Sequence, residues 1–220
     1  MASLVYIADP MCSWCYGFGP ELAALLEGLP GMPIHIVLGG LRAYNRQPMD
    51  EELKNTLLTH WEHVRQRTGL PFSPDVLSSA GFVYDTEPAC RAVVAARTIA
   101  PDAGFAVFRA IQHAFYGQGL DVTRREVLAA TAVATLTEAG FPTSAEDFLA
   151  VWHAETTVAA TRGDFEQSKR WGVSGFPTLV LEREGRLDLV TAGYVPMPTL
   201  VERMQALVDR DAPANGGTAA

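Results

Sequence analysis

Residues 4–20, LVYIADPMCSWCYGFGP, decide the fold of this chain. The stretch begins with an apolar run rich in the β-favouring residues Val, Tyr and Ile, and Asp9-Pro10 ends that run, which predicts a buried strand and a tight turn. A helix is then expected to begin close to Cys12, with Cys15 three residues later. A Cys-x-x-Cys pair at the start of a helix indicates redox chemistry.

The position of the two cysteines suits a nucleophilic thiol. The thiolate is the reactive form, and a helix N-terminus stabilises it through unpaired N–H groups and the positive end of the helix dipole. Cys12 is therefore predicted to attack. Cys15 lies roughly one helical turn further on, within disulfide reach, and is predicted to resolve the mixed disulfide.

Composition limits the classes of partner. The 220 residues are 48% hydrophobic, enough to bury a sizeable core, and we expect one domain that contains a large insertion. The formal net charge of −8, without a basic stripe, argues against a nucleic-acid or anionic-membrane partner.

The N-terminal apolar run has no Lys or Arg ahead of it and is too short for a secretion signal or a membrane span. We therefore expect a cytoplasmic protein with no membrane partner. The chain has three cysteines, an odd number, which does not describe a disulfide framework. In that setting a Cys-x-x-Cys pair is typical of a catalytic or a metal-binding site.

Further elements follow from the pattern of apolar residues. The first helix is expected to kink near Pro20 and continue to Glu27, two short helices being the alternative. Residues 34–38, IHIVL, predict a second strand, which completes a right-handed βαβ unit with parallel strands. Residues 178–182 and 187–191 predict a β-hairpin. A final helix is expected at residues 197–208, and a disordered tail at residues 212–220.

Residues 47–170 show helical spacing throughout and predict a helical insertion. Two pairs of residues indicate helix starts within it: Thr123 with Glu126 as a capping box, and Ser144 with Asp147 as a looser version. The helices are expected at residues 49–67, 88–100, 102–116, 123–139, 144–153 and 156–170.

Together these features resemble the DsbA-like branch of the thioredoxin superfamily, and more closely its cytoplasmic members of the FrnE type. The resemblance covers nearly the whole chain. It is carried by the motifs Asp9-Pro10-Met11-Cys12-Ser13-Trp14-Cys15-Tyr16-Gly17, Gly39-Gly40-Leu41-Arg42, Pro88-Ala89-Cys90-Arg91-Ala92 and Gly172-Val173-Ser174-Gly175-Phe176-Pro177-Thr178.

The resemblance implies an α/β thioredoxin fold with a large helical insertion. Residues 1–46 and 171–211 would form the discontinuous thioredoxin-like domain, and residues 47–170 the insertion. It also implies a cis Pro177 that faces the cysteines as part of the catalytic site. The implied activity is thiol-disulfide exchange of the protein disulfide isomerase kind, without a cofactor, on protein or peptide thiols and disulfides, with glutathione as a further candidate partner.

The sequence departs from the family in one way that matters. Ser13-Trp14 stands between the cysteines and lacks the histidine of periplasmic DsbA, which predicts lower oxidising power. Glutathione-dependent isomerases and transferases of similar fold generally have a serine in place of Cys12 and no second cysteine. They remain the first alternative, although the presence of both thiols favours dithiol exchange.

Other readings of the cysteines and histidines stay open at this point. Cys12 and Cys15 could form half of a zinc site, completed by histidines or Cys90, in a protein that is not an enzyme. Cys90 is expected to be a buried, small apolar residue, with a regulatory thiol as the alternative. His60 and His63 share a helix face, which is expected to be solvated rather than metal-binding.

Several side chains are candidates for the surroundings of the site. Asp9 is expected to cap the helix or form the turn, and alternatively to tune protonation. Ser13, Trp14 and Phe176 are predicted to bind substrate. The aromatic residues Trp14, Phe18, Phe176 and Tyr194 could form an apolar lip around the cysteines, although core packing is the alternative, above all for Phe18 and Tyr194.

Overall fold

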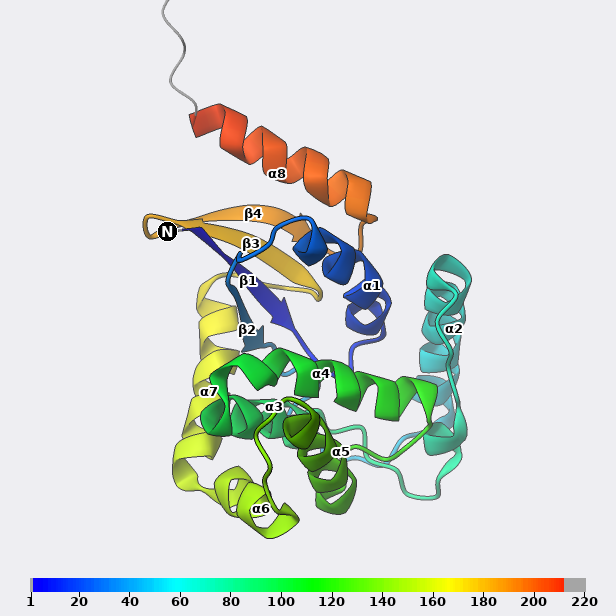
Figure 1. The fold of residues 1–220 in the computed structure, drawn as a ribbon. Helices are drawn as coiled ribbons and strands as arrows, with labels where there is room; N and C mark the ends of the chain where they lie inside the picture. The colour runs from blue at the N-terminus through cyan, green and yellow to red at the C-terminus, as the bar shows by residue number, and fades with distance from the viewer. Residues whose placement is uncertain (1, 212–220) are drawn as a thin grey trace, which may run out of the picture.

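A computed structural model describes residues 2–211 of the chain (Figure 1). Within them, a four-stranded sheet combines with eight α-helices and three short helical segments. In chain order these are β1 (Ala2–Ala8), α1 (Ser13–Glu27), β2 (Ile34–Leu38), α2 (Glu51–Thr68), η1 (Asp75–Ser78), α3 (Glu87–Ile99), η2 (Pro101–Ala103), α4 (Gly104–Gln112), η3 (His113–Gly117), α5 (Arg125–Glu138), α6 (Ala145–His153), α7 (Glu155–Arg170), β3 (Thr178–Arg183), β4 (Arg186–Ala192) and α8 (Met197–Asp211).

The sheet has the strand order β2-β1-β3-β4, so β1 lies between β2 and β3. β1 pairs with β2 in parallel, Leu4 opposite Ile34, and this confirms the predicted βαβ unit. β3 runs antiparallel to both β1 and β4, which confirms the hairpin. The central position of β1 explains its apolar run, because neither of its faces meets water.

The hairpin turn follows from its two residues. Glu184 and Gly185 have φ angles of 53° and 77°. Positive φ at both central positions matches the twist of the flanking strands in a two-residue hairpin.

Helix α1 runs through Pro20 to Glu27 without a break, so the alternative of two short helices is wrong. The predicted helix over residues 102–116 is instead interrupted. Its first residues form the 3₁₀ turn η2, and it ends in the π-turn η3, in which the Gln118 N–H donates to the His113 carbonyl at 3.0 Å.

The two predicted helix starts in the insertion differ in outcome. Ser144 caps α6 as expected, because its Oγ accepts from the Asp147 N–H at 3.0 Å. The Thr123–Glu126 capping box is wrong. The Thr123 hydroxyl donates to Asp121 Oδ1 at 2.6 Å, and α5 begins two residues later without a side-chain cap.

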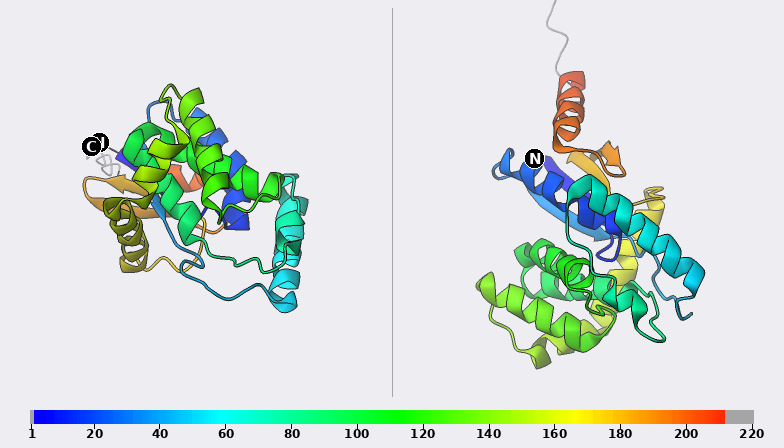
Figure 2. Two further views of the ribbon diagram at one scale, coloured as in Figure 1. Left: turned by 90° about the horizontal axis from the view of Figure 1, so that it is seen from below. Right: turned by 90° about the vertical axis from the view of Figure 1, so that its right-hand side faces the viewer.

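The predicted insertion is helical across α2–α7, and its helices lie mostly at one end of the sheet (Figures 1 and 2). Helices α1 and α8 contact each other on one side of the sheet, and α7 contacts β2. The hydrophobic core is continuous between these parts. Tyr6 of β1 contacts Phe18 of α1 and Phe108 of α4, with ring centroids 6.0 and 5.8 Å apart.

Helix α8 extends the predicted C-terminal helix by three residues, to Asp211. Leu200, Met204 and Leu207 are its buried residues, at the spacing of one helix face. The tail predicted at residues 212–220 lies outside the described residues.

Candidate active site

Cys12 lies at the N-terminus of α1, directly after β1 and the turn that follows it. It is the N-cap residue, with an extended backbone (φ −94°, ψ 117°), and its N–H donates to the Asp9 carbonyl at 3.1 Å. No side chain caps the helix, so the first-turn N–H groups of α1 have no side-chain acceptor. Its side chain is 7% exposed, whereas that of Cys15 is fully buried.

Cys15 lies on the first turn of α1 and hydrogen-bonds with Cys12. Burial, together with this bond and the Cys12 charge, raises the pKa of the Cys15 thiol well above its ordinary value. Both cysteines are free thiols. The arrangement therefore offers one partly accessible sulfur and, behind it, a second sulfur that stays protonated at neutral pH.

The loop before β3 approaches the cysteines from the far end of the chain. The Sγ of Cys12 lies 3.7 Å from the Phe176 carbonyl oxygen, and the Phe176–Pro177 peptide is cis, as the resemblance implied. Pro177 itself is buried. The sulfur of Cys12 thus has a backbone acceptor next to it, in the loop that leads into the inner strand β3.

Gly39 makes room for this loop. A Cβ at Gly39 would lie 2.0–2.7 Å from three ring atoms of Phe176, so only glycine leaves the ring where it is. Gly39 follows β2 directly, and its N–H donates to the Ala8 carbonyl at 2.8 Å. The sequence signalled it only as the end of a strand and as part of the Gly-Gly-Leu-Arg motif.

Three of the four aromatic residues suggested for an apolar lip do gather at the site. Trp14, Phe176 and Tyr194 are half-buried, and together with Gly193 they line a cavity of about 480 Å³. The Trp14 and Tyr194 rings are 5.7 Å apart. Phe18 is fully buried and belongs to the core instead. Ser13, at the start of α1, is half-buried as well.

Asp9 is completely buried and joins three segments. Its Oδ1 accepts from the Met11 N–H at 2.8 Å, and its Oδ2 accepts from the Leu41 N–H at 2.7 Å and from the Cys90 thiol at 3.5 Å. Burial raises the pKa of Asp9, although these hydrogen bonds oppose the rise. Asp9 therefore forms the turn, as expected, but it does not cap α1.

Cys90 is buried, as predicted, in α3. Its contact with Asp9 makes it more than a small apolar residue. Burial, followed by the Asp9 charge, raises the pKa of Cys90 well above its ordinary value. A buried, protonated thiol is a poor nucleophile, and this fits a structural role better than a regulatory one.

Tyr84 also holds the turn before Cys12, and no sequence signal pointed to it. Its hydroxyl donates to the Met11 carbonyl, and burial raises its pKa. Tyr84 stacks on Phe115, and Phe115 contacts Tyr116, within an aromatic cluster supplied by the insertion. The insertion thereby supports the loop that carries the cysteines.

The zinc alternative would need ligands that the structure does not bring together. Among residues 2–211, no group of three or more His, Cys, Asp or Glu side chains could hold a metal ion. His60 and His63 are exposed on α2, as expected of a solvated face.

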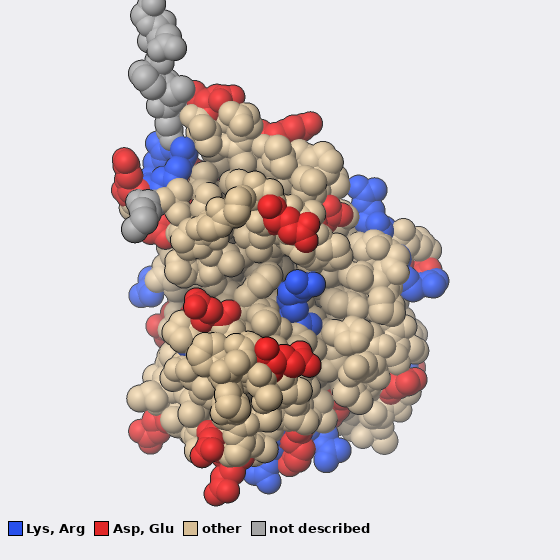
Figure 3. Space-filling model, in the orientation of Figure 1, with Lys and Arg blue, Asp and Glu red and all other residues tan. Residues whose placement is uncertain are grey.

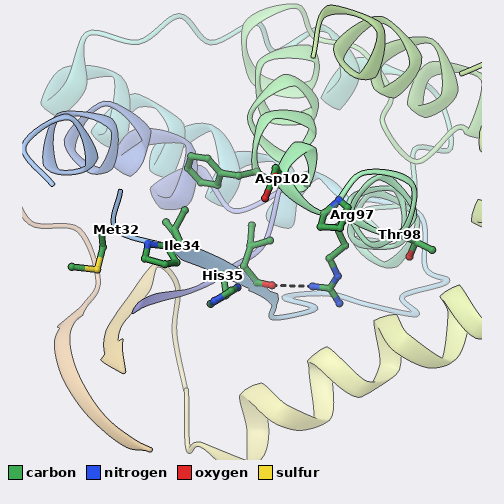
Figure 4. A pocket seen from close by; sticks show the side chains of 11 residues that line it. Met32, Ile34, His35, Arg97, Thr98 and Asp102 are labelled. Carbon is green, nitrogen blue, oxygen red and sulfur yellow. Dashed lines mark hydrogen bonds between the residues drawn. The ribbon is translucent and has the colours of Figure 1, made fainter. Parts of the chain in front are cut away.

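A cavity of about 710 Å³ lies away from the cysteines (Figure 4). It lies between the start of β2 and the turn from α3 to α4. Arg97 crosses it, donates to the Ile36 carbonyl at 2.9 Å and forms an ion pair with Asp164 at 2.8 Å. The Arg97 guanidinium therefore already has partners, and neither Cys12 nor Cys15 lines this cavity.

On the face shown in Figure 3, the described Lys and Arg side chains are scattered among acidic ones and form no continuous basic surface. None of the helices between residues 2 and 211 has the length and apolarity that crossing a membrane requires.

The fold and the position of the cysteines define a protein of the thioredoxin class. Residues 4–205 match the family model of the DSBA-like thioredoxin domain, and the chain belongs to that family. The predicted α/β thioredoxin fold with a helical insertion is confirmed. The FrnE-type subdivision stays a prediction. No curated protein matches the sequence.

Solved structures of similar proteins carry related names. A "putative protein disulfide isomerase" from Nitrosomonas europaea is 35% identical, with a TM-score of 0.85 over 96% of this chain and 99% of that chain. The cytosolic disulfide reductase DsbM from Pseudomonas aeruginosa is 32% identical, with a TM-score of 0.76 over 94% and 98%. The oxidoreductase DsbA from Xylella fastidiosa, 15% identical with a TM-score of 0.61 over 97% and 87%, is similar in fold alone.

Proposed function

We propose that the protein is a thiol-disulfide oxidoreductase in which Cys12 attacks and Cys15 resolves. One observation carries the proposal: the less buried sulfur lies at a helix N-terminus, 3.7 Å from the Phe176 carbonyl, with the second thiol one turn behind it. The site would thus combine a nucleophilic thiolate, a resolving thiol and a backbone segment that a peptide can approach.

The proposed reaction balances as a two-electron exchange. The Cys12 thiolate attacks one sulfur of the substrate disulfide, the substrate S–S bond breaks, and the leaving thiolate takes up a proton. Cys15 loses its proton and attacks Cys12, which releases the second substrate thiol and leaves a Cys12–Cys15 disulfide. The substrate gains two electrons and the pair loses two. A thiol such as glutathione would return the pair to its reduced form.

The remaining site residues would position the substrate. An extended peptide could form backbone hydrogen bonds with the loop at Phe176, just before the start of β3, and present its disulfide to Cys12. Pro177 lacks an N–H and would shape this loop, and it would keep metal ions from the two sulfurs. Ser13 and Trp14 lie between the cysteines and would contact the groups that flank the substrate sulfurs.

The natural partners would be protein or peptide thiols and disulfides, together with glutathione, in the cytoplasm. Two printed names support this part of the proposal. The relative DsbM is described as a cytosolic disulfide reductase, and a second structure of it, 30% identical to this chain, is described with GSH. Isomerase activity of the protein disulfide isomerase kind would need the same Cys12 attack.

Three single substitutions test the mechanism on a model protein disulfide with glutathione as the reductant. Cys12→Ser should lower turnover by about 1000-fold or more, because no nucleophile remains. Cys15→Ser should accumulate a mixed disulfide between Cys12 and the substrate, detectable by mass. Cys90→Ala is the matched control and should stay within about twofold of the unchanged protein.

Two outcomes would contradict the proposal. Full turnover by Cys12→Ser would remove Cys12 as the nucleophile. Full glutathione-dependent turnover by Cys15→Ser would favour the alternative, a glutathione-dependent isomerase or transferase that works with one thiol.

A further inference from the structure

The cavity of about 480 Å³ beside the cysteines is lined on one side by residues of the helical insertion. Trp14, Phe176 and Tyr194 form its apolar side, and His63 and Arg67 of α2 form the other. Helix α2 belongs to the insertion and packs against α1. The insertion therefore brings charged and titratable side chains into the space where the flanking groups of a disulfide substrate would lie.

Arg67 is an exposed cation without a charge partner. Its guanidinium lies over the Tyr194 ring, 5.7 Å from the centroid, and no described carboxylate lies within 4.0 Å of it. Arg65, two residues earlier, instead forms an ion pair with Glu62 at 2.8 Å. Contact with an aromatic ring restricts a guanidinium. Arg67 also hydrogen-bonds with the Tyr194 hydroxyl, which leaves others of its N–H donors for an anion.

The nearest acidic side chain on this side of the site is already engaged. Glu21 accepts from the Tyr194 hydroxyl at 2.7 Å through Oε1, and from the Met197 N–H at 2.7 Å through Oε2. Its hydrogen bonds hold it on Tyr194 and the start of α8 rather than on Arg67. The lining of the cavity thus contains the cation Arg67 and no carboxylate, although the chain as a whole carries a formal charge of −8.

We propose that Arg67 makes the site selective for disulfides that carry a carboxylate close to the reacting sulfur. This inference rests on the proposed function. The apolar residues would cover the carbon atoms next to the disulfide, and the guanidinium would bind the carboxylate through two parallel hydrogen bonds. His63 would contribute a further donor. The carboxylate could belong to glutathione disulfide or to an acidic residue beside the cysteine of a peptide.

A local cation is physically useful here because the net negative charge of the protein repels anionic substrates. Charges that line a cleft raise the local concentration of an oppositely charged substrate despite an unfavourable net charge. A neutral or cationic disulfide would gain nothing from Arg67, so the effect should appear as a preference between substrates.

The test compares three disulfides: oxidised glutathione, which is anionic, hydroxyethyl disulfide, which is neutral, and cystamine, which is cationic. The kcat/KM of each is measured at one ionic strength and divided by its uncatalysed rate with a small thiol. Arg67→Gln should lower the value for oxidised glutathione by about tenfold and leave that for hydroxyethyl disulfide within about twofold. Arg67→Glu should reverse the preference and favour cystamine.

Arg65→Gln is the matched control, because it removes the same charge from the same helix outside the cavity. It should leave all three values unchanged. Equal losses for the three disulfides in the Arg67 variants would overturn the inference and make Arg67 a structural residue. Absence of turnover with every disulfide in the unchanged protein would instead overturn the proposed function.

A second comparison separates the two sources of carboxylate. Peptide disulfides with Glu or Gln next to the cysteine are compared in the unchanged protein and in Arg67→Gln. A Glu preference that disappears in the variant supports recognition of acidic peptides. Selectivity with oxidised glutathione alone supports glutathione, and selectivity with neither substrate contradicts the inference.

Discussion

Asp9 is the residue on which the turn before Cys12 depends most. Its two oxygens accept from the N–H groups of Met11 and Leu41 and from the Cys90 thiol. A buried N–H that loses its acceptor costs about 1–3 kcal/mol. The carboxyl group therefore stabilises the loop that carries the nucleophile, even though burial makes its own ionisation unfavourable.

We expect Asp9→Ala to lower the free energy of unfolding by about 3 kcal/mol, because two donors lose their partner. Urea denaturation under reducing conditions measures this. Asp209→Ala, at an exposed position of α8, is the control and should change the value by less than about 0.5 kcal/mol. A loss below about 1 kcal/mol for Asp9→Ala would mean that water or a shifted loop replaces the carboxyl group.

The pH dependence of resolution follows from the buried thiol of Cys15. Burial is the main cause of its raised pKa and does not depend on a charge at Cys12, which the mixed disulfide lacks, so the reactive thiolate is scarce at neutral pH. Below that pKa the thiolate fraction grows about tenfold for each pH unit. The decay of the mixed disulfide should accelerate accordingly between about pH 6 and pH 9. Rapid acid quench and mass spectrometry measure the decay, and a rate independent of pH would exclude deprotonation of Cys15 as the limiting step.

At the scale of elements, the end of β2 and the loop before β3 are fitted to each other. Gly39 lies under the Phe176 ring, at distances that no Cβ could share. Gly175, one residue before Phe176, has nothing within 4 Å of an added Cβ. An added side chain is therefore expected to disturb the Phe176 loop at Gly39 and to be accommodated at Gly175.

Gly39→Ala should push the Phe176 ring away and raise KM for a peptide disulfide by about tenfold, because a displaced positioning group weakens substrate binding. Gly175→Ala should leave KM within about twofold. Steady-state kinetics on the two variants measure this. Equal effects of the two substitutions would show that the loop responds to any added side chain and not to the Phe176 contact.

At the scale of the whole molecule, the insertion and the sheet share one core. Tyr6, from the central strand, contacts Phe108 of the insertion, and Tyr84 of the insertion donates to the Met11 carbonyl next to Cys12. The boundaries predicted at residues 47 and 170 therefore divide the chain by sequence pattern and not by separate cores. The part that carries the cysteines depends on the part that surrounds it.

We expect cooperative unfolding of both parts in one transition. Far-ultraviolet circular dichroism reports mainly on the helices, and labelling of Cys15 with a thiol reagent reports on the first turn of α1. Both measurements should give the same urea midpoint. Phe108→Ala should lower both midpoints together, at a cost of about 3–5 kcal/mol. Separate midpoints would mean that the insertion unfolds on its own.

Local sequence patterns predicted most of the helices and strands, but they did not predict contacts between residues far apart in the sequence. The strand at residues 34–38, the hairpin and the Ser144 cap follow from neighbours in the sequence. The Thr123 cap failed because the Thr123 hydroxyl donates to Asp121, two residues before it, instead of capping a helix. The cysteine pair and Pro177 were recognisable as motifs. Nothing within α2 indicated that Arg67 would lie over the Tyr194 ring, because that contact joins segments far apart in the sequence.

The position of Trp14 gives the protein an optical signal. Trp14 lies between the two cysteines in the sequence, and its ring is 5.7 Å from the Tyr194 ring. Trp61 and Trp152 are buried elsewhere, and Trp171, which is 37% exposed, does not line the cavity beside the cysteines. A nearby disulfide quenches indole emission, so oxidation of the pair should dim the fluorescence of Trp14 specifically. Each turnover could then be followed without a label. Trp14→Phe would serve as the control, because its fluorescence should not change when the pair is oxidised.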